Sequence, residues 1–208
     1  MRARWLAGWA TVGLLFGCNP AETFGVDEVT RMEVTAEVPV LLHLPGDALP
    51  GLPADRTLPV VAPLQVDVLQ SLREAGAVAE ADLIKAHRQK AERIEVLSVE
   101  YEILEPNNLP YDLEPIALGV GPYTPAPDPE TAFPIGSTMP VPAGRAIAAR
   151  ELAYAPEGLK TAGVLVQPLA FTLYGQTRVH VPADTPVPPN QVTVRLSMKV
   201  RVHLDLAR

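Results

Sequence analysis

The sequence has one cysteine among its 208 residues, at position 18. A single thiol cannot form a disulfide within the chain, so an internal cross-link is excluded as a source of stability. Histidine is almost as scarce, and none of the four residues occurs in an HxH, HxxxH or HExxH arrangement. The sequence therefore predicts no metal site and no cofactor.

Basic residues are fewer than acidic ones, 17 against 24, which gives a formal net charge of −7. Nucleic-acid-binding proteins gather lysine and arginine on one face, so this balance predicts no nucleic-acid partner. Aromatic residues make up only 5%, and both tryptophans, Trp5 and Trp9, lie within the first nine residues. The body of the chain therefore lacks the tryptophan platforms on which sugar-binding sandwiches stack their ligands.

The motifs of common enzyme classes are missing as well. No serine lies in a GxSxG sequence, and no Walker loop or GxGxxG sequence is present. Glu100 and Glu102 are spaced like a catalytic carboxylate pair, but two acids on one face of a strand are typical of a solvent-exposed surface. The sequence predicts that the protein is not an enzyme.

The sequence has no apolar run long enough to span a membrane, and its first apolar run is short. Arg2 and Arg4 precede an apolar stretch of about 12 residues from Trp5 to Phe16, the length of the core of a signal peptide. A bilayer core requires about 20 apolar residues, so this stretch is too short to span it. It ends in Leu15-Phe16-Gly17-Cys18.

This ending resembles the lipobox of bacterial lipoproteins, although a residue smaller than Phe16 is more usual at that position. The resemblance implies cleavage between Gly17 and Cys18 and a thioether-linked diacylglycerol on Cys18, with an acylated amine. The alternative is an ordinary secretory signal with a chance cysteine, but an odd free thiol is unusual in a secreted protein. In enteric bacteria an aspartate after the lipidated cysteine retains a lipoprotein in the inner membrane. Asn19 occupies that position here, which favours the outer membrane.

Three regions are predicted on this basis: a lipoprotein signal peptide (1–17), a lipid-anchored tether (18–28) and a single β-sandwich domain (29–208). The tether, NPAETFGVDE after the cysteine, shows no hydrophobic periodicity. No change in composition and no internal repeat divides the rest of the chain into two domains.

The strongest structural pattern is QVTVRLSMKVRVHLDL at 191–206, in which every even position is apolar and every odd position is polar. Period two over this length predicts a long half-buried strand. Residues 30–43 alternate in the same way, and Pro39 there predicts an edge or a bulge. A third strand is predicted at 92–104, with Leu97, Val99, Tyr101 and Ile103 on one face.

Charge predicts that the first and last of these strands are neighbours. The polar face of 30–43 carries Glu33 and Glu37, and that of 191–206 carries Arg195, Lys199 and Arg201. Opposite charges across a strand pair contribute about 0.2–1 kcal/mol each, so the two faces favour adjacent positions in one sheet. The pattern leaves the direction of pairing open.

Shorter strands are predicted at 116–120, 146–154, 164–175 and 177–181, the last two as a hairpin around Gly175-Gln176. Residues 66–76 and 79–94 instead have apolar spacings of three and four, which predict one or two short helices within about 66–92, with Gly76 at a helix end. The sequence thus predicts a mainly β fold, an antiparallel β-sandwich with a helical insert.

Proline is abundant: 23 of the 208 residues are proline, roughly twice the usual share of about 5%. The clusters at 45–63, 122–142 and 182–189 predict extended loops. Tyr111, Tyr123 and Phe133 flank these loops and are predicted as an interaction patch. The other interpretation is that they fasten the loops to the sandwich.

The strand pattern of the body, VxAxVPV, then LxVxYxI, then xVxVxVxL around a helical segment, resembles small β-sandwich lipoproteins of proteobacteria, most of which have no assigned activity. The predicted function is a non-enzymatic, membrane-anchored binding or assembly subunit of the cell envelope, with a protein partner. The alternative is a carrier of a lipid or small apolar ligand held between the sheets, and the third choice is an envelope enzyme.

Overall fold

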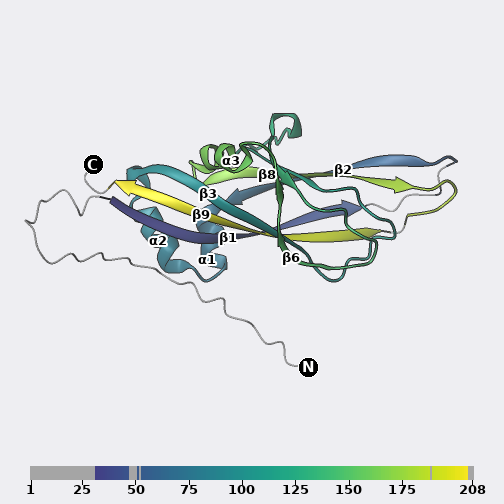
Figure 1. Ribbon diagram of the computed structural model, residues 1–208, viewed down its shortest axis with the longest axis horizontal. Helices are drawn as coiled ribbons and strands as arrows, with labels where there is room; N and C mark the ends of the chain where they lie inside the picture. Colours follow the sequence, from purple (N-terminus) through teal and green to yellow (C-terminus); the bar gives the residue numbers. More distant parts are fainter. Residues whose placement is uncertain (1–30, 47–50, 52, 188, 206–208) are drawn as a thin grey trace, which may run out of the picture.

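The computed structural model describes residues 31–46, 51, 53–187 and 189–205. Within them the strands are β1 (Arg31–Gly46), β2 (Arg56–Asp67), β3 (Ala91–Ile103), β4 (Ala117–Pro122), β5 (Phe133–Ser137), β6 (Ile147–Glu151), β7 (Ala153–Tyr154), β8 (Ala170–Val181) and β9 (Asn190–Asp205). They form a sheet in the order β1-β9-β3-β6 and a second in the order β2-β8-β4-β5-β7. All pairs are antiparallel, and Figure 1 shows the two layers, which confirms the predicted β-sandwich.

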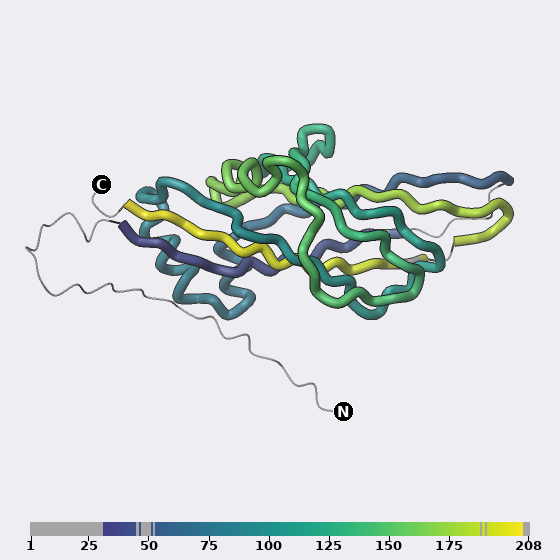
Figure 2. The backbone as a smooth tube through the Cα atoms, in the orientation of Figure 1, coloured from purple at the N-terminus to yellow at the C-terminus, as the bar shows by residue number. Residues whose placement is uncertain are grey.

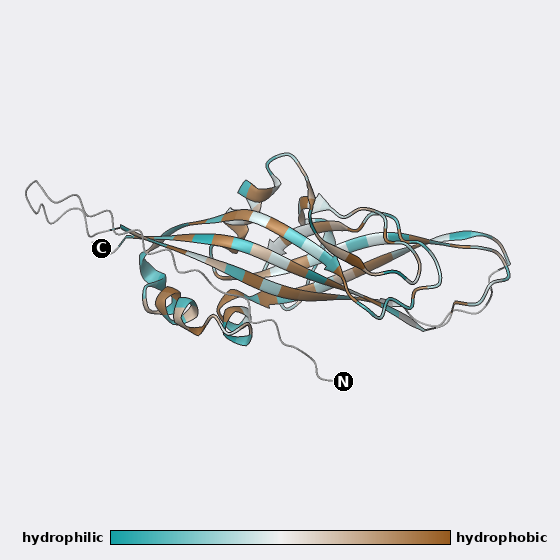
Figure 3. Ribbon diagram, turned by 60° about the horizontal axis from the view of Figure 1, so that its bottom comes forward, coloured by the Kyte–Doolittle hydropathy of each residue, from teal (hydrophilic) through white to brown (hydrophobic). Residues whose placement is uncertain are grey.

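The core lies between the layers and is built from the alternating strands. Val38, Leu42, Leu196 and Val202 are all at most 2% exposed, and Figure 3 shows the alternation of hydrophilic and hydrophobic residues along the long strands. Burying each such side chain contributes about 1.5–3 kcal/mol. The layers pack closely at Gly175, where a Cβ would lie 2.5 Å from Cδ2 of Leu42.

The predicted neighbourhood of the first and last strands is confirmed, and the pairing is antiparallel. Arg31 faces Asp205 at one end of the ladder, and Gly46 faces Asn190 at the other. Glu37 lies opposite Lys199, and β1 is an edge strand, as Pro39 predicts. Figure 2 shows the two strands side by side along the length of the molecule.

One face of β3 differs from the prediction. Val96 is buried while Leu97 is only partly buried, and the register with β9 shifts between Val96 and Ser98. A bulge places an extra residue in one strand, so the buried positions change from even to odd numbers at this point. Placing Leu97 on the buried face was therefore wrong, whereas Val99, Tyr101 and Ile103 are buried as predicted.

The predicted helical insert is present as α1 (Val68–Glu74) and α2 (Val78–Ala86). The Asp67 carboxylate accepts a hydrogen bond from the backbone N–H of Gln70 at 3.0 Å and so caps α1. Gly76 has φ +86° just after the end of α1, which is the glycine position predicted there. The second predicted helix is too long, because the chain passes through a 3₁₀ turn (Arg88–Lys90) into β3.

Two segments were assigned wrongly from the sequence. Residues 164–175 and 177–181 do not form a hairpin, since β8 continues straight through Gly175-Gln176. The first part of that range belongs instead to a third helix, α3 (Gly158–Val166). In addition, 45–63 is not all loop, because β2 occupies residues from Arg56 onwards despite Pro59 and Pro63.

The α3 side of the sandwich is closed. Helix α3 follows β7 and covers the free edge of β3, where the Ile94 N–H donates to the Gln167 side chain at 2.8 Å. At its start, the backbone N–H of Ala155 donates to the carbonyl of Ile135 in β5 at 2.8 Å. Strands β6 and β7 cross from one sheet to the other beside it. The part of the β3 edge around Ile94 is therefore covered, which limits pairing with other chains there.

The opposite side is formed by two long edge strands, β1 and β2, that face each other. Helix α1 packs against both strands, and α2 contacts β1; Figure 1 shows the two helices along one half of β1.

Candidate functional site

The predicted lipidation and cleavage residues, Cys18 and Gly17, lie outside the described residues. The anchor and the tether stay predictions. Among the residues that the structure describes, no helix is both long and apolar enough to cross a membrane.

The three aromatic residues predicted as one patch are not brought together. Tyr123 and Phe133 are each 52% exposed, whereas Tyr111 is partly buried against the core. Along β8, Pro122 lies opposite Phe171 and the bridge of Leu113 lies opposite Val179. Eight residues of strand span about 26 Å, so Tyr111 is far from the other two. Its contact with the core fits the loop-fastening interpretation.

The two histidines on the polar faces of β1 and β9 are also far apart. His43 lies opposite Thr193, and His203 lies opposite Glu33. Ten residues of strand, about 33 Å, separate them, so they cannot share a metal ion. No group of three or more histidine, cysteine, aspartate or glutamate residues within the described ranges is placed to hold one.

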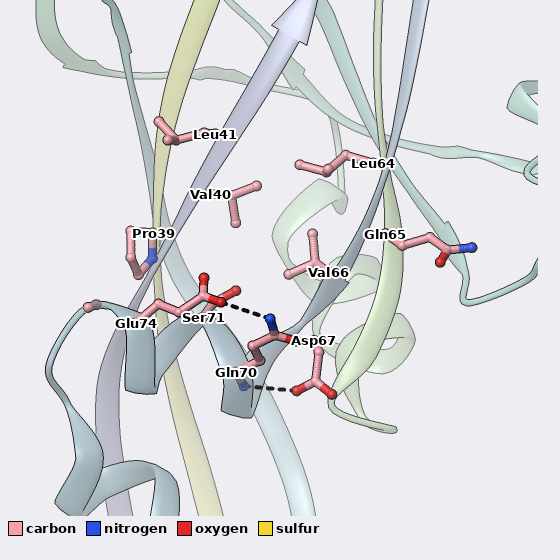
Figure 4. Close-up of a pocket in the computed structure, with 11 residues that line it drawn as sticks. Pro39, Val40, Leu41, Leu64, Gln65, Val66, Asp67, Gln70, Ser71 and Glu74 are labelled. Atoms are coloured by element: carbon pink, nitrogen blue, oxygen red, sulfur yellow. Dashed lines mark hydrogen bonds between the residues drawn. The ribbon is translucent and has the colours of Figure 1, made fainter.

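The described residues also form a groove of about 400 Å³ between the edge strands β1 and β2. Its apolar floor comes from Val40 on β1 and from Leu64 and Val66 on β2, and Figure 4 shows Val40 and Leu64 facing each other across it. Val40 and Val66 are buried and Leu64 is partly buried. Volumes of about 300–1,000 Å³ are usual for small-molecule sites.

Helix α1 supplies a polar margin to one side of this floor, through Gln70, Ser71 and Glu74, with Asp67 at its cap. The Gln70 side-chain amide donates to Glu74 Oε1 at 2.8 Å, and the two dashed bonds of Figure 4 show how Gln70 links both carboxylates. The groove thus joins an apolar floor to hydrogen-bonding groups at fixed positions, which is the arrangement that recognises an amphipathic molecule.

Prolines make the two walls of the groove poor templates for strand addition. Pro39 lies in β1, and Pro59 and Pro63 lie in β2, both of them edge strands. Proline has no N–H, and within sheets it occupies edge positions whose nitrogen faces away from the neighbouring strand. An incoming strand would find donors missing along both edges. The groove is therefore better suited to a small ligand than to a pairing peptide.

A second polar arrangement surrounds His203 on the outer face of the first sheet. Its Nδ1 lies 3.1 Å from Glu33 on β1, and its Nε2 lies 3.2 Å from Glu95 on β3. Arg93 also lies 2.6 Å from Glu95. The hydrogen bond from His203 lowers the pKa of Glu95 below its usual value of 4.5, and the charges of Arg93, His203 and Arg201 act in the same direction against partial desolvation. Charged side chains therefore tie three adjacent strands together.

We expect Glu95→Gln to destabilise the protein at neutral pH and to lose this effect in acid. A carboxyl whose pKa is lowered by folding contributes stability above its unfolded pKa, and that contribution disappears as the pH falls through the folded value. Urea unfolding from pH 7 downwards would show the wild type and the variant converging below about pH 4.5. Glu92→Gln, an exposed change on the same strand, is the control, and a constant difference at all pH values would contradict the assignment.

The comparisons with known proteins assign no family. No family model matches the chain, and no curated protein matches it. A solved structure is similar over 96% of this chain and 94% of its own: a chain from the semi-empty virus-like particle of Macrobrachium rosenbergii nodavirus, from the giant freshwater prawn. That chain is 12% identical, with a TM-score of 0.33. A likeness at this level carries no argument about function.

The groove was not predicted from the sequence, although one signal was present. Residues 56–67 alternate in burial, with the prolines at odd positions and Ala62, Leu64 and Val66 at even ones. Prolines at odd positions alone are compatible with an edge strand, because the nitrogens of alternate residues face away from the neighbouring strand. Identifying β2 would have given one wall, but only the fold shows which strand forms the other.

Proposed function

We propose that this chain is a non-enzymatic binding protein of the cell envelope, anchored by lipid at Cys18, that holds a small amphipathic molecule in the groove between β1 and β2. The observation that carries the proposal is the groove itself, an apolar floor between β1 and β2 beside a hydrogen-bonding margin from α1. The ligand's apolar part lies on Val40, Leu64 and Val66, and its polar part lies against α1. This develops the carrier alternative, because prolines on both walls disfavour a protein strand as the occupant.

The test is the mass of the native protein after extraction from its membrane in mild detergent. We expect an intact mass that lacks residues 1–17 and carries acyl groups, together with a bound small molecule that is released on denaturation. An unmodified Cys18 would contradict the anchor. A co-purifying protein without any small molecule would contradict the carrier function and favour an assembly subunit.

The location of the ligand is tested by filling the groove. Leu64→Trp places a larger side chain on the floor, so we expect at least about tenfold less bound molecule, equal to about 1.4 kcal/mol of binding free energy. Leu58→Trp is the matched control, since Leu58 is also partly buried on the same face of β2 but does not line the groove. Equal retention of the molecule by the two variants would place its site elsewhere.

A further inference from the structure

The charged side chains that line the groove are all negative. Its eleven described lining residues include two carboxylates, Asp67 and Glu74, and no lysine, arginine or histidine. The nearest cation in sequence, Arg73, is held away by an ion pair with Asp82 at 2.9 Å. Both lining carboxylates are exposed at the surface of α1, so a charged group can reach them without losing all of its water.

The two carboxylates also have hydrogen-bonding capacity left for a ligand. An ionised carboxylate offers about four acceptor positions. Asp67 accepts from the backbone N–H of Gln70, and Glu74 accepts from the Gln70 side chain. Within the described residues neither of them forms an ion pair. Gln70 therefore holds both groups in place without supplying a positive charge to offset theirs.

From this geometry we infer that the ligand is a cationic amphiphile, a small molecule with an apolar body and an ammonium or guanidinium head. The inference rests on the proposed function and gives its ligand a charge. The body covers Val40, Leu64 and Val66, and the head lies at Asp67 and Glu74. An anionic amphiphile of the same shape would meet two like charges, which the groove has no basic residue to offset.

The experiment uses three photoreactive probes that share one diazirine-bearing octyl chain and differ in the head: trimethylammonium, sulfate or maltoside. The mature, lipid-anchored protein is labelled in nonionic detergent, and cross-linked peptides are mapped by mass spectrometry. We expect the trimethylammonium probe to label peptides from β1, β2 and α1 more strongly than the sulfate probe. The preference should weaken as salt is raised, because salt screens exposed charges.

The matched variants are isosteric. Asp67→Asn retains a capping residue for α1, and Glu74→Gln retains an acceptor for Gln70. Together they should reduce groove labelling by the trimethylammonium probe about threefold to tenfold and leave the maltoside probe unchanged. The control removes the same charge elsewhere, by Glu114→Gln with Glu130→Gln, and should retain the preference.

The outcomes separate this inference from the proposed function. Equal labelling of the groove by the cationic and anionic probes, unaffected by Asp67→Asn with Glu74→Gln, would overturn the charge assignment and leave the groove as an amphiphile site. A preference lost equally in the Glu114 and Glu130 control would attribute it to net charge and would also overturn it. No labelling of the groove by any probe would overturn both proposals.

Discussion

Replacing Leu196 with alanine is expected to lower the free energy of unfolding by about 2–5 kcal/mol. Leu196 is 2% exposed in the middle of β9, between Val40 on β1 and Tyr101 on β3. Truncation removes buried methyl groups and leaves a cavity that strands paired on both sides cannot collapse to fill. Urea unfolding followed by circular dichroism measures the loss.

Lys199→Ala is the control on the same strand. Its side chain lies on the outer face, so the change in unfolding free energy should stay within about 0.5 kcal/mol. Equal losses for the two variants would mean that both faces of β9 depend on packing, contrary to the burial pattern of the strand.

Replacing Gly163 with alanine is expected to cost about 1–3 kcal/mol, although alanine normally favours helices. A Cβ at Gly163 would lie 2.7 Å from the carbonyl oxygen of Ile94, a backbone atom that cannot move aside as a side chain can. Helix α3 would have to lift from the edge of β3, and the 2.8 Å hydrogen bond between Ile94 and Gln167 would lengthen.

Hydrogen exchange of the β3 amides would locate the effect of this substitution. The Ile94 amide should exchange faster in Gly163→Ala, while the β1–β9 ladder keeps its protection. Val164→Ala, at the next residue of α3 and 71% exposed, should change the unfolding free energy by no more than about 0.5 kcal/mol. Unchanged exchange at Ile94 would contradict the close packing of α3 on β3.

The long strands could be predicted because their physical cause is local. In β1 and β9 the side chains point alternately into the core and towards solvent. Apolar and polar residues therefore alternate along the sequence with a period of two. Their pairing could be predicted as well, since acidic residues on one outer face favour a strand with basic residues on the same face, and Glu37 lies opposite Lys199. The bulge at Leu97 could not be predicted, because it arises from the register between β3 and β9 and not from the residue itself.

The errors arose where tertiary packing overrides local preference. Residues 164–166, Val-Leu-Val, favour a strand, yet they end a helix because Gly158 and Gly163 let α3 pack on the backbone of β5 and β3. Proline in 45–63 suggested a loop, yet proline is tolerated in β2 because that strand has a partner on one side only.

The candidate site was the least predictable part. Its residues come from β1, β2 and α1, and no motif connects Val40 with Leu64 or Glu74. They meet because two edge strands from different sheets lie on the same side of the sandwich, which depends on the order of the strands and not on any one segment.

The antiparallel pairing of β1 with β9 also decides how the domain carries mechanical load. The hydrogen bonds of such a ladder lie across the strands. A pull on Arg31 of β1 that is resisted at Asn190 of β9, at the opposite end of the ladder, loads all 16 residue pairs in shear at once. A pull that separates Arg31 from its partner Asp205 instead opens the ladder one pair at a time. The domain therefore resists stretching along its length but unzips when force parts its two ends.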